Sequence, residues 1–103
     1  MISRIWHGWT DPANADAYED MLRSVVLPEI SERVNGYLGV YLLRRDHGQE
    51  VEFVTVTMFA TFDAVRSFAG DDYEAAVIEP EAAKLLSRFD DRVAHYETII
   101  APD

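Results

Sequence analysis

Apolar and polar positions along the chain divide it into short strands and helices. The clearest strand is residues 51–61, which are rich in β-branched and aromatic side chains, as strands are. One face of this strand is wholly apolar, and on the other two phenylalanines flank two threonines. A strand covered on both faces gives this pattern, and a buried helix of equal length would give it as well. From Thr61 the apolar spacing becomes helical, which predicts a short helix capped by Thr61 or Asp63 and ended by Gly70.

The N-terminal third of the chain predicts a strand followed by a helix. Residues 2–9 place apolar side chains on both faces of a strand, because even and odd positions point to opposite sides. Asp11 and Pro12 then provide a helix cap and a first helical residue. We expect Pro28 to kink or end this helix near Val26, with one further turn possible beyond it. The apolar stripe of the helix consists of Tyr18, Met21, Leu22 and Val25.

The C-terminal third predicts smaller elements. Beyond Gly70, the apolar residues within 73–77 indicate another helical turn or two. Pro80 should start a short segment that buries Ala83. Residues 92–100 alternate between apolar and polar side chains and are predicted to form the last strand.

These elements predict a single ferredoxin-like domain over residues 1–103. Residues 37–45 form a strand that pairs with residues 51–61 across a turn at 46–49. The resulting order is β-α-β-β-α-β, the split βαβ arrangement of the α+β class. Right-handed crossovers place the first and third strands in the centre of a four-stranded antiparallel sheet, with both helices on one face.

The uncovered face of this sheet predicts self-association. Helices can cover only one face, yet residues 2–9 and 51–61 carry apolar side chains on both. A second copy of the sheet is the simplest cover for the other face. We therefore predict a homodimer whose interface is formed by the sheet faces that lack helices.

Composition narrows the classes of partner. The 103 residues include 19 Asp and Glu against 9 Lys and Arg, a formal net charge of −10. Nucleic acid and anionic membrane surfaces are therefore poor partners. The absence of cysteine excludes disulfides and thiolate chemistry. The sequence shows neither a secretory signal nor a run of about 20 apolar residues, so we expect a cytoplasmic protein that does not enter a membrane.

The sequence resembles the antibiotic biosynthesis monooxygenase family of the dimeric α+β barrel superfamily over essentially its whole length. The resemblance rests on short segments in each predicted element, namely 4–8, Tyr18, 39–45, 52–53, 63–70, 76–77, Pro80 and 95–97. It implies a ferredoxin-like fold that dimerises into an α+β barrel. The superfamily includes cofactor-free monooxygenases that oxidise polyketide phenols, haem-degrading enzymes and lactone isomerases, so the fold alone does not select the chemistry.

The resemblance argues against haem degradation in this chain. Haem-degrading members use an asparagine in the first strand, a tryptophan in the second helix and a histidine further along. The corresponding positions here hold His7, Phe68 and Val77. Valine cannot ligate iron, so we expect that haem is not a substrate.

The cluster at residues 6–9 is the most suggestive chemical feature. His7 lies between Trp6 and Trp9, and an imidazole that titrates near pH 6.5 could act as general base on an acidic phenol or enol. Gly8 would leave space for a flat ligand, and the two indoles would form pocket walls. The alternative is that both tryptophans are core or dimer contacts and that His7 is a hydrogen-bonded residue at a strand end.

Further candidates come from the last strand and from arginine. His95 and Tyr96 point to opposite faces, so one of them at most can share a pocket with His7, as a hydrogen-bond partner of the substrate. Arg4 could orient an anionic substrate. We assign Phe68 and Tyr73 to the substrate site as well. His7 and His95 alone are too few for a metal site, and no cofactor motif is present, so we expect neither a metal nor a cofactor.

The sequence thus favours a cofactor-independent monooxygenase that uses O₂ on a small, flat phenolic or enolic compound, bound between sheet and helices. In such chemistry the deprotonated substrate reduces O₂ itself, and the protein provides a base, orientation and a dry cavity. The alternative is a dimeric protein of the same fold that binds a small molecule without catalysis.

Overall fold

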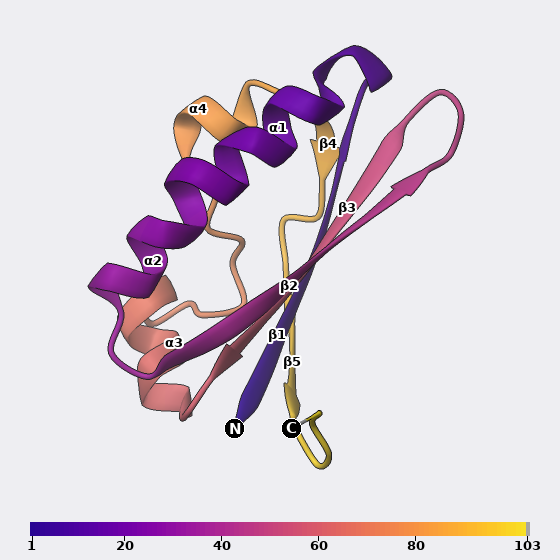
Figure 1. Cartoon of the computed structure of the whole chain (residues 1–103). Helices are drawn as coiled ribbons and strands as arrows, with labels where there is room; N and C mark the ends of the chain where they lie inside the picture. Colours follow the sequence, from indigo (N-terminus) through magenta and orange to yellow (C-terminus); the bar gives the residue numbers. More distant parts are fainter. Residues whose placement is uncertain (103) are drawn as a thin grey trace.

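Five strands form one antiparallel sheet in the computed structural model, which describes residues 1–102, and the helices lie on one face of it (Figure 1). The strands are β1 (Ile2–Thr10), β2 (Tyr37–Asp46), β3 (Val51–Phe59), β4 (Leu86–Phe89) and β5 (Ala94–Glu97). The α-helices are α1 (Ala15–Met21), α2 (Leu27–Arg33), α3 (Phe62–Ala69) and α4 (Pro80–Ala83). The strand order is β2-β3-β1-β4. β4 pairs with the C-terminal part of β1, and β5 pairs with its N-terminal part. The predicted ferredoxin-like α+β arrangement, with β1 and β3 at its centre, is confirmed.

Alternation along β1 divides its side chains between two environments. The even-numbered residues from Ile2 to Thr10 are buried under the helices, and the odd-numbered ones are half-buried on the other face. The β1–β3 register places Trp6 opposite Thr55 and His7 opposite Val54. Trp6 and His7, although adjacent in the sequence, therefore lie on opposite faces of the sheet.

The first long helix continues past Pro28 to Arg33, so of the alternatives that the sequence left open the helix does not end near Val26 but extends beyond it. A π-helical turn (Leu22–Val26) joins α1 to α2, and in it the Leu27 N–H donates to the Leu22 carbonyl. A π turn inserts an extra residue into the helix just before Pro28, which has no N–H to donate. Val26 packs against the core, whereas Val25 is 53% exposed rather than on the buried stripe.

The segment from 70 to 79 forms no helix, so the prediction of helical turns there is wrong. Residues 71–79 are irregular apart from a bridge between Ala75 and Arg92. The carbonyls of Tyr73 and Ala75 accept hydrogen bonds from the Arg4 side chain, which lies on β1. These bonds satisfy backbone groups that a helix would otherwise pair.

The last strand is also divided. Instead of one strand over 92–100, β4 and β5 both pair antiparallel with β1. The short helix α4 does begin at Pro80, with the Glu79 carboxylate accepting from the N–H groups of Glu81 and Ala82. Ala82, and not Ala83, is the residue that α4 buries.

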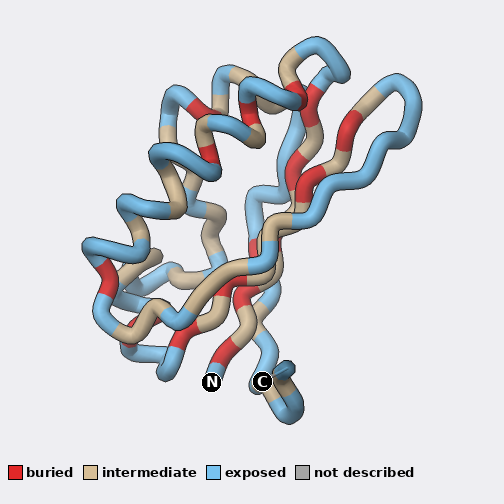
Figure 2. The backbone as a smooth tube through the Cα atoms, in the orientation of Figure 1, coloured by how far each residue is buried: buried red, intermediate tan, exposed pale blue. Residues whose placement is uncertain are grey.

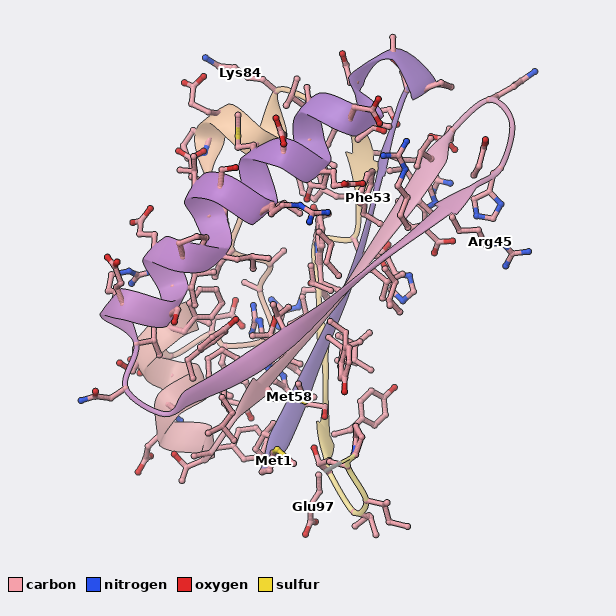
Figure 3. The ribbon with its side chains drawn as sticks, in the orientation of Figure 1. Met1, Arg45, Phe53, Met58, Lys84 and Glu97 are labelled. Carbon is pink, nitrogen blue, oxygen red and sulfur yellow. The ribbon has the colours of Figure 1, made fainter. Side chains whose placement is uncertain are left out.

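The buried apolar residues form two clusters, and Figure 2 marks the buried positions in red along the backbone. The larger contains Trp6, Tyr18, Leu22 and Phe53, and Figure 3 shows Phe53 pointing from β3 toward the helical layer. The smaller lies under α3, where the Thr61 hydroxyl accepts from the Ala64 N–H at 3.1 Å and Gly70 ends the helix with φ of +85°. The sequence predicted this capped helix correctly.

Within residues 1–102, no helix lies against the opposite face of the sheet. Apolar side chains lie there on four strands, β2, β3, β1 and β5, and several are about half exposed, with Tyr41 at 46%, Leu43 at 50% and Tyr96 at 56%. Ile5 and Val56 pair across the centre of this face. This surface, hereafter the open face, fits the predicted dimer interface, and the homodimer itself stays a prediction. None of the helices in residues 1–102 has the length and apolar character needed to span a membrane.

Candidate functional site

A cavity of about 70 Å³ lies between the sheet and the helices. Most of its wall is apolar, with Trp6 from β1, Leu22 and Val26 from the π turn, Ile30 from α2 and Phe68 from α3. The polar groups in the wall are Arg4, Tyr18, Thr55, Thr57 and Glu79. An apolar hollow with a few convergent polar groups is the usual form of a small-molecule site.

Arg4 is the most unusual of these polar groups. Its residue surface is 4% exposed, and its Nη1 donates to the Tyr73 carbonyl at 2.5 Å and to His95 Nε2 at 3.0 Å. Nη2 donates to the Ala75 carbonyl at 3.0 Å, and the guanidinium lies 5.3 Å from the centre of the Phe68 ring. Burial lowers the pKa of Arg4 to about 10, so the side chain is still a cation at neutral pH.

His95 adopts one tautomer because of Arg4. A guanidinium can only donate, so His95 Nε2 must accept and the proton must reside on Nδ1. That Nδ1 atom is buried and has no hydrogen-bond partner within residues 1–102. Burial, and then the charge of Arg4, lower the pKa of His95, with Glu74 opposing them. His95 is therefore a neutral acceptor that holds Arg4.

Tyr18 contributes a buried hydroxyl. Its residue surface is 2% exposed and its ring packs edge-on against Phe53, with centroids 4.9 Å apart. Burial raises the pKa of Tyr18 well above its usual value, so the phenol stays protonated and can act only as a neutral donor or acceptor. The sequence identified Tyr18 as a core residue of the helix but gave no signal of its place in the cavity wall.

Trp6 forms a fixed part of the wall. Its Nε1 donates to the Asp90 carbonyl at 2.9 Å, and its indole lies over Gly8. A Cβ at Gly8 would lie 2.3 Å from Trp6 Cη2. The space that Gly8 leaves is therefore filled by the indole of Trp6, and not by a flat ligand as the sequence suggested.

His7 and Trp9 lie on the open face, away from the cavity. His7 Nδ1 lies 3.0 Å from Glu52 Oε2, and His47 Nε2 lies 2.8 Å from Glu52 Oε1. These two hydrogen bonds lower the pKa of Glu52, and the one from His47 has the larger effect. The Trp9 ring has the Arg88 guanidinium 3.8 Å from its centre.

The structure thus separates the residues that the sequence grouped into one site. Arg4, Trp6 and Phe68 line the cavity. His95 and Tyr73 lie behind Arg4, which they contact through an imidazole and a carbonyl. The residues on the open face are His7, Trp9 and Tyr96. The reason is strand alternation, since odd positions of β1 cannot reach the helical side. Residues 1–102 contain no cluster of three or more His, Cys, Asp or Glu side chains arranged to hold a metal ion.

No family model matches the sequence, and no curated protein matches it. Solved structures do match. A protein from Deinococcus radiodurans that is assigned to the antibiotic biosynthesis monooxygenases aligns with a TM-score of 0.66 and 15% identity, covering 100% of this chain and 97% of that one. The ActVA-Orf6 monooxygenase of Streptomyces coelicolor, solved with the ligand nanaomycin D, aligns with a TM-score of 0.62 and 17% identity over 99% and 92% of the two chains.

A second kind of protein shares the same fold. The haem-degrader MhuD of Mycobacterium tuberculosis, solved with two haems in its active site, aligns with a TM-score of 0.58 and 21% identity over 100% of both chains. At these identities the likeness is one of fold. The expectation drawn from the sequence is confirmed at that level: this chain has the α+β fold of the antibiotic biosynthesis monooxygenases.

Proposed function

We propose that the protein is a cofactor-independent monooxygenase acting on a small, flat phenolic or enolic compound that binds in the cavity between sheet and helices. The observation that carries the proposal is the apolar cavity itself, walled by Trp6 and Phe68 and containing the cation of Arg4. The fold is shared with a monooxygenase that was solved with nanaomycin D. This likeness supports the proposal without identifying the substrate.

The reaction requires a substrate that can reduce O₂ directly. Deprotonation gives an electron-rich phenolate or enolate, which transfers an electron to O₂ and then joins it to form a hydroperoxide. Loss of water converts the hydroperoxide carbon to a carbonyl. In the keto tautomer of the substrate, the carbon that is oxidised is a CH₂ group. One oxygen atom of O₂ becomes the carbonyl oxygen on that carbon, and the other leaves as water together with the two hydrogens of the CH₂ group. The protein contributes orientation and exclusion of solvent.

The cavity's size restricts the ligand. A volume of about 70 Å³ compares with about 300–1,000 Å³ for sites of drug-sized ligands. A single aromatic ring is the natural scale, and a fused-ring substrate would require side chains of the wall to move apart.

One observation favours the alternative of a binding protein without catalysis. The cavity wall offers no free general base, because the Glu79 carboxylate is held by the N-terminus of α4 and His7 faces the other side of the sheet. A catalytic role for His7 or Tyr96 remains a prediction, and it would require a ligand on the open face. In the proposed reaction the substrate must therefore be acidic enough to ionise without a base from this wall.

Oxygen uptake with a panel of anthrone-type compounds and hydroquinones tests the proposal. We expect consumption of O₂ with at least one acidic member, and loss of that activity in Phe68→Ala. Trp9→Phe is the matched control, because it alters an aromatic side chain on the open face and should leave turnover unchanged. Ligand-induced thermal stabilisation without any oxygen uptake would instead establish the binding protein.

A further inference from the structure

The buried charge of Arg4 has no carboxylate partner among residues 1–102. The charged pairs in that part of the chain join partly or fully exposed side chains, such as Arg44 with Asp16 or Arg88 with Glu50. The chain carries a net charge of −10, so acidic side chains are abundant. A buried cation is costly unless it is paired, and here only two carbonyls and a neutral imidazole surround it.

The Arg4 side chain also retains hydrogen-bonding capacity. A guanidinium has five N–H donors, and the three hydrogen bonds to Tyr73, His95 and Ala75 use three of them. The Tyr18 residue is 2% exposed, and its phenol hydroxyl can donate one hydrogen bond. Arg4 and Tyr18 both contribute to the cavity wall. The site thus holds a positive charge and spare donors, and the Glu79 carboxylate in its wall is hydrogen-bonded to the N-terminus of α4 rather than to Arg4.

We infer that the cavity binds its ligand as an aromatic oxyanion, a phenolate or a carboxylate, with Arg4 as the counter-charge, Tyr18 as a hydrogen-bond donor and His95 as the residue that positions Arg4. This inference rests on the proposed use of the cavity as a ligand site, but not on catalysis. It names the substrate class of the proposed function, because a site that stabilises the oxyanion lowers the pKa of a bound phenol. Such a site would compensate for the absence of a free general base in the cavity wall.

Two nearby carboxylates, those of Glu79 and Glu74, are the candidate ion-pair partners of Arg4 within the protein. Glu79 is part of the wall, but its oxygen accepts from two N–H groups of α4, at 2.9 and 3.2 Å, which disperse its charge. Glu74 acts on His95 from the segment that follows α3, and it lies 3.7 Å from Arg92. Neither forms an ion pair with Arg4, whose charge is therefore available to a ligand.

A purely structural role for Arg4 is the rival explanation. Its bonds to the Tyr73 and Ala75 carbonyls tie the irregular segment 70–79 to β1. That role would make Arg4 important for folding, but it gives the cavity no preference between charged and neutral ligands. Ligand charge selectivity therefore distinguishes the two explanations.

The decisive measurement compares isosteric probes on the unaltered protein. Calorimetric titration should show benzoate binding at least about tenfold more tightly than benzamide, the smallest factor expected from hydrogen bonds to a charged group. The second probe, 4-nitrophenol, reports its ionisation through its visible absorption band. Its apparent pKa should fall on binding by at least about one unit, the same tenfold preference for the phenolate. Selectivity for benzoate alone would restrict the site to carboxylates, and selectivity in the dye alone would restrict it to phenolates.

Variants then assign the selectivity to residues. Arg4→Gln should abolish the preference, and Tyr18→Phe should reduce it. Arg45→Gln removes the same unit charge from an exposed position that projects away from the helices (Figure 3) and should change nothing. His95→Ala should weaken benzoate binding but not benzamide binding, and His95→Gln, which retains an acceptor, should restore it.

Equal affinity of the unaltered protein for benzoate and benzamide, or no binding of any probe, would overturn the inference. A folded Arg4→Gln protein that keeps the preference would also overturn it. If Arg4→Gln does not fold, the benzoate and benzamide affinities of the unaltered protein and of Tyr18→Phe still test the inference. Anion selectivity without oxygen uptake would refute the proposed monooxygenase and leave the inferred anion site standing. Oxygen uptake without anion selectivity would refute the anion site and leave the proposed monooxygenase standing.

Discussion

Replacing Gly8 by alanine tests how the wall of the cavity is built. The added Cβ would lie 2.3 Å from Trp6 Cη2, 2.8 Å from Cζ2 and 3.0 Å from Cζ3. Carbon atoms in contact prefer about 3.5–4.0 Å, so the indole must move by about 1 Å or more. That shift would break the hydrogen bond from Trp6 Nε1 to the Asp90 carbonyl, which is 2.9 Å long.

The expected cost follows from three contributions. Overpacking a core position costs about 1–3 kcal/mol, and the lost hydrogen bond costs about 1 kcal/mol. Alanine recovers about 0.5–1 kcal/mol because glycine loses more backbone entropy in a strand. The free energy of unfolding should therefore fall by about 1–3.5 kcal/mol for Gly8→Ala, which corresponds to roughly 4–28 °C in Tm for a domain of this size.

A double-mutant cycle with Trp6→Phe isolates the contact. Phenylalanine lacks the outer indole atoms that the new methyl group would meet, so Gly8→Ala should cost less than about 1 kcal/mol in that background. Urea denaturation of the four proteins gives the coupling energy directly. A cost within about 0.5 kcal/mol of zero in the native background would refute this reasoning. The same cost in both backgrounds would show that the strain at Gly8 has another source.

Three further predictions concern the dimer, haem and pH. Light scattering at micromolar concentration should show a dimer, and a monomeric native protein would contradict this prediction. Ile5 lies at the centre of the open face beside Val56. Ile5→Asp should give a folded monomer, because one buried carboxylate per subunit destabilises an apolar interface. Hemin should give no sharp Soret band of an axially ligated complex and no bleaching with ascorbate, since Val77 cannot ligate iron, and a stoichiometric complex with a defined spectrum would reverse that conclusion. Burial and the charge of Arg4 lower the pKa of His95 below its usual 6.5, so below that pH the unfolded chain binds a proton that the folded chain does not. The free energy of unfolding should therefore decline as pH falls from about 6.5 until folded His95 also protonates, and a urea series in which His95→Asn keeps the same slope would exclude His95 as its origin.

The sequence was sufficient for the sheet because a strand's signal is local. Alternation and β-branched composition over residues 2–9, 37–45 and 51–61 predicted β1, β2 and β3 to within two residues. The cap at Thr61 and the stop at Gly70 likewise depend only on neighbouring residues, and both are present in the structure. The topology then followed from connection rules that hold for most α+β folds.

The C-terminal third was not predictable from local pattern because distant contacts decide it. Helical spacing in 73–77 is overridden by Arg4, more than 65 residues away, which takes the carbonyls of Tyr73 and Ala75. Pro28 was expected to disturb the helix, but its effect was absorbed by a π turn that no propensity predicts. In residues 73–77 these distant hydrogen bonds outweigh differences in helix propensity of up to about 0.7 kcal/mol per residue.

The candidate site was only partly predictable. Arg4, Trp6 and Phe68 were assigned to it from the sequence, and all three line the cavity. The grouping of His7 and Trp9 with Trp6 rested on adjacency in the sequence, although the alternation that predicted the strand already placed them on the other face. Tyr18 carried no local mark of its role, since a tyrosine on the apolar stripe of a helix is usually a core residue.

The position of Trp6 determines which wall of the cavity can adapt to a ligand. On the sheet side, the indole is fixed by its hydrogen bond to Asp90 and by its packing over Gly8, and Arg4 is fixed by three hydrogen bonds. On the helical side the wall contains Tyr18 and Phe68 but is otherwise mostly aliphatic, and it includes Val77, which is 47% exposed. Displacing aliphatic side chains sacrifices dispersion contacts but breaks no hydrogen bond. A ligand larger than about 70 Å³ must therefore gain its space from the helical side, with its ring against the flat, rigid surface that β1 presents.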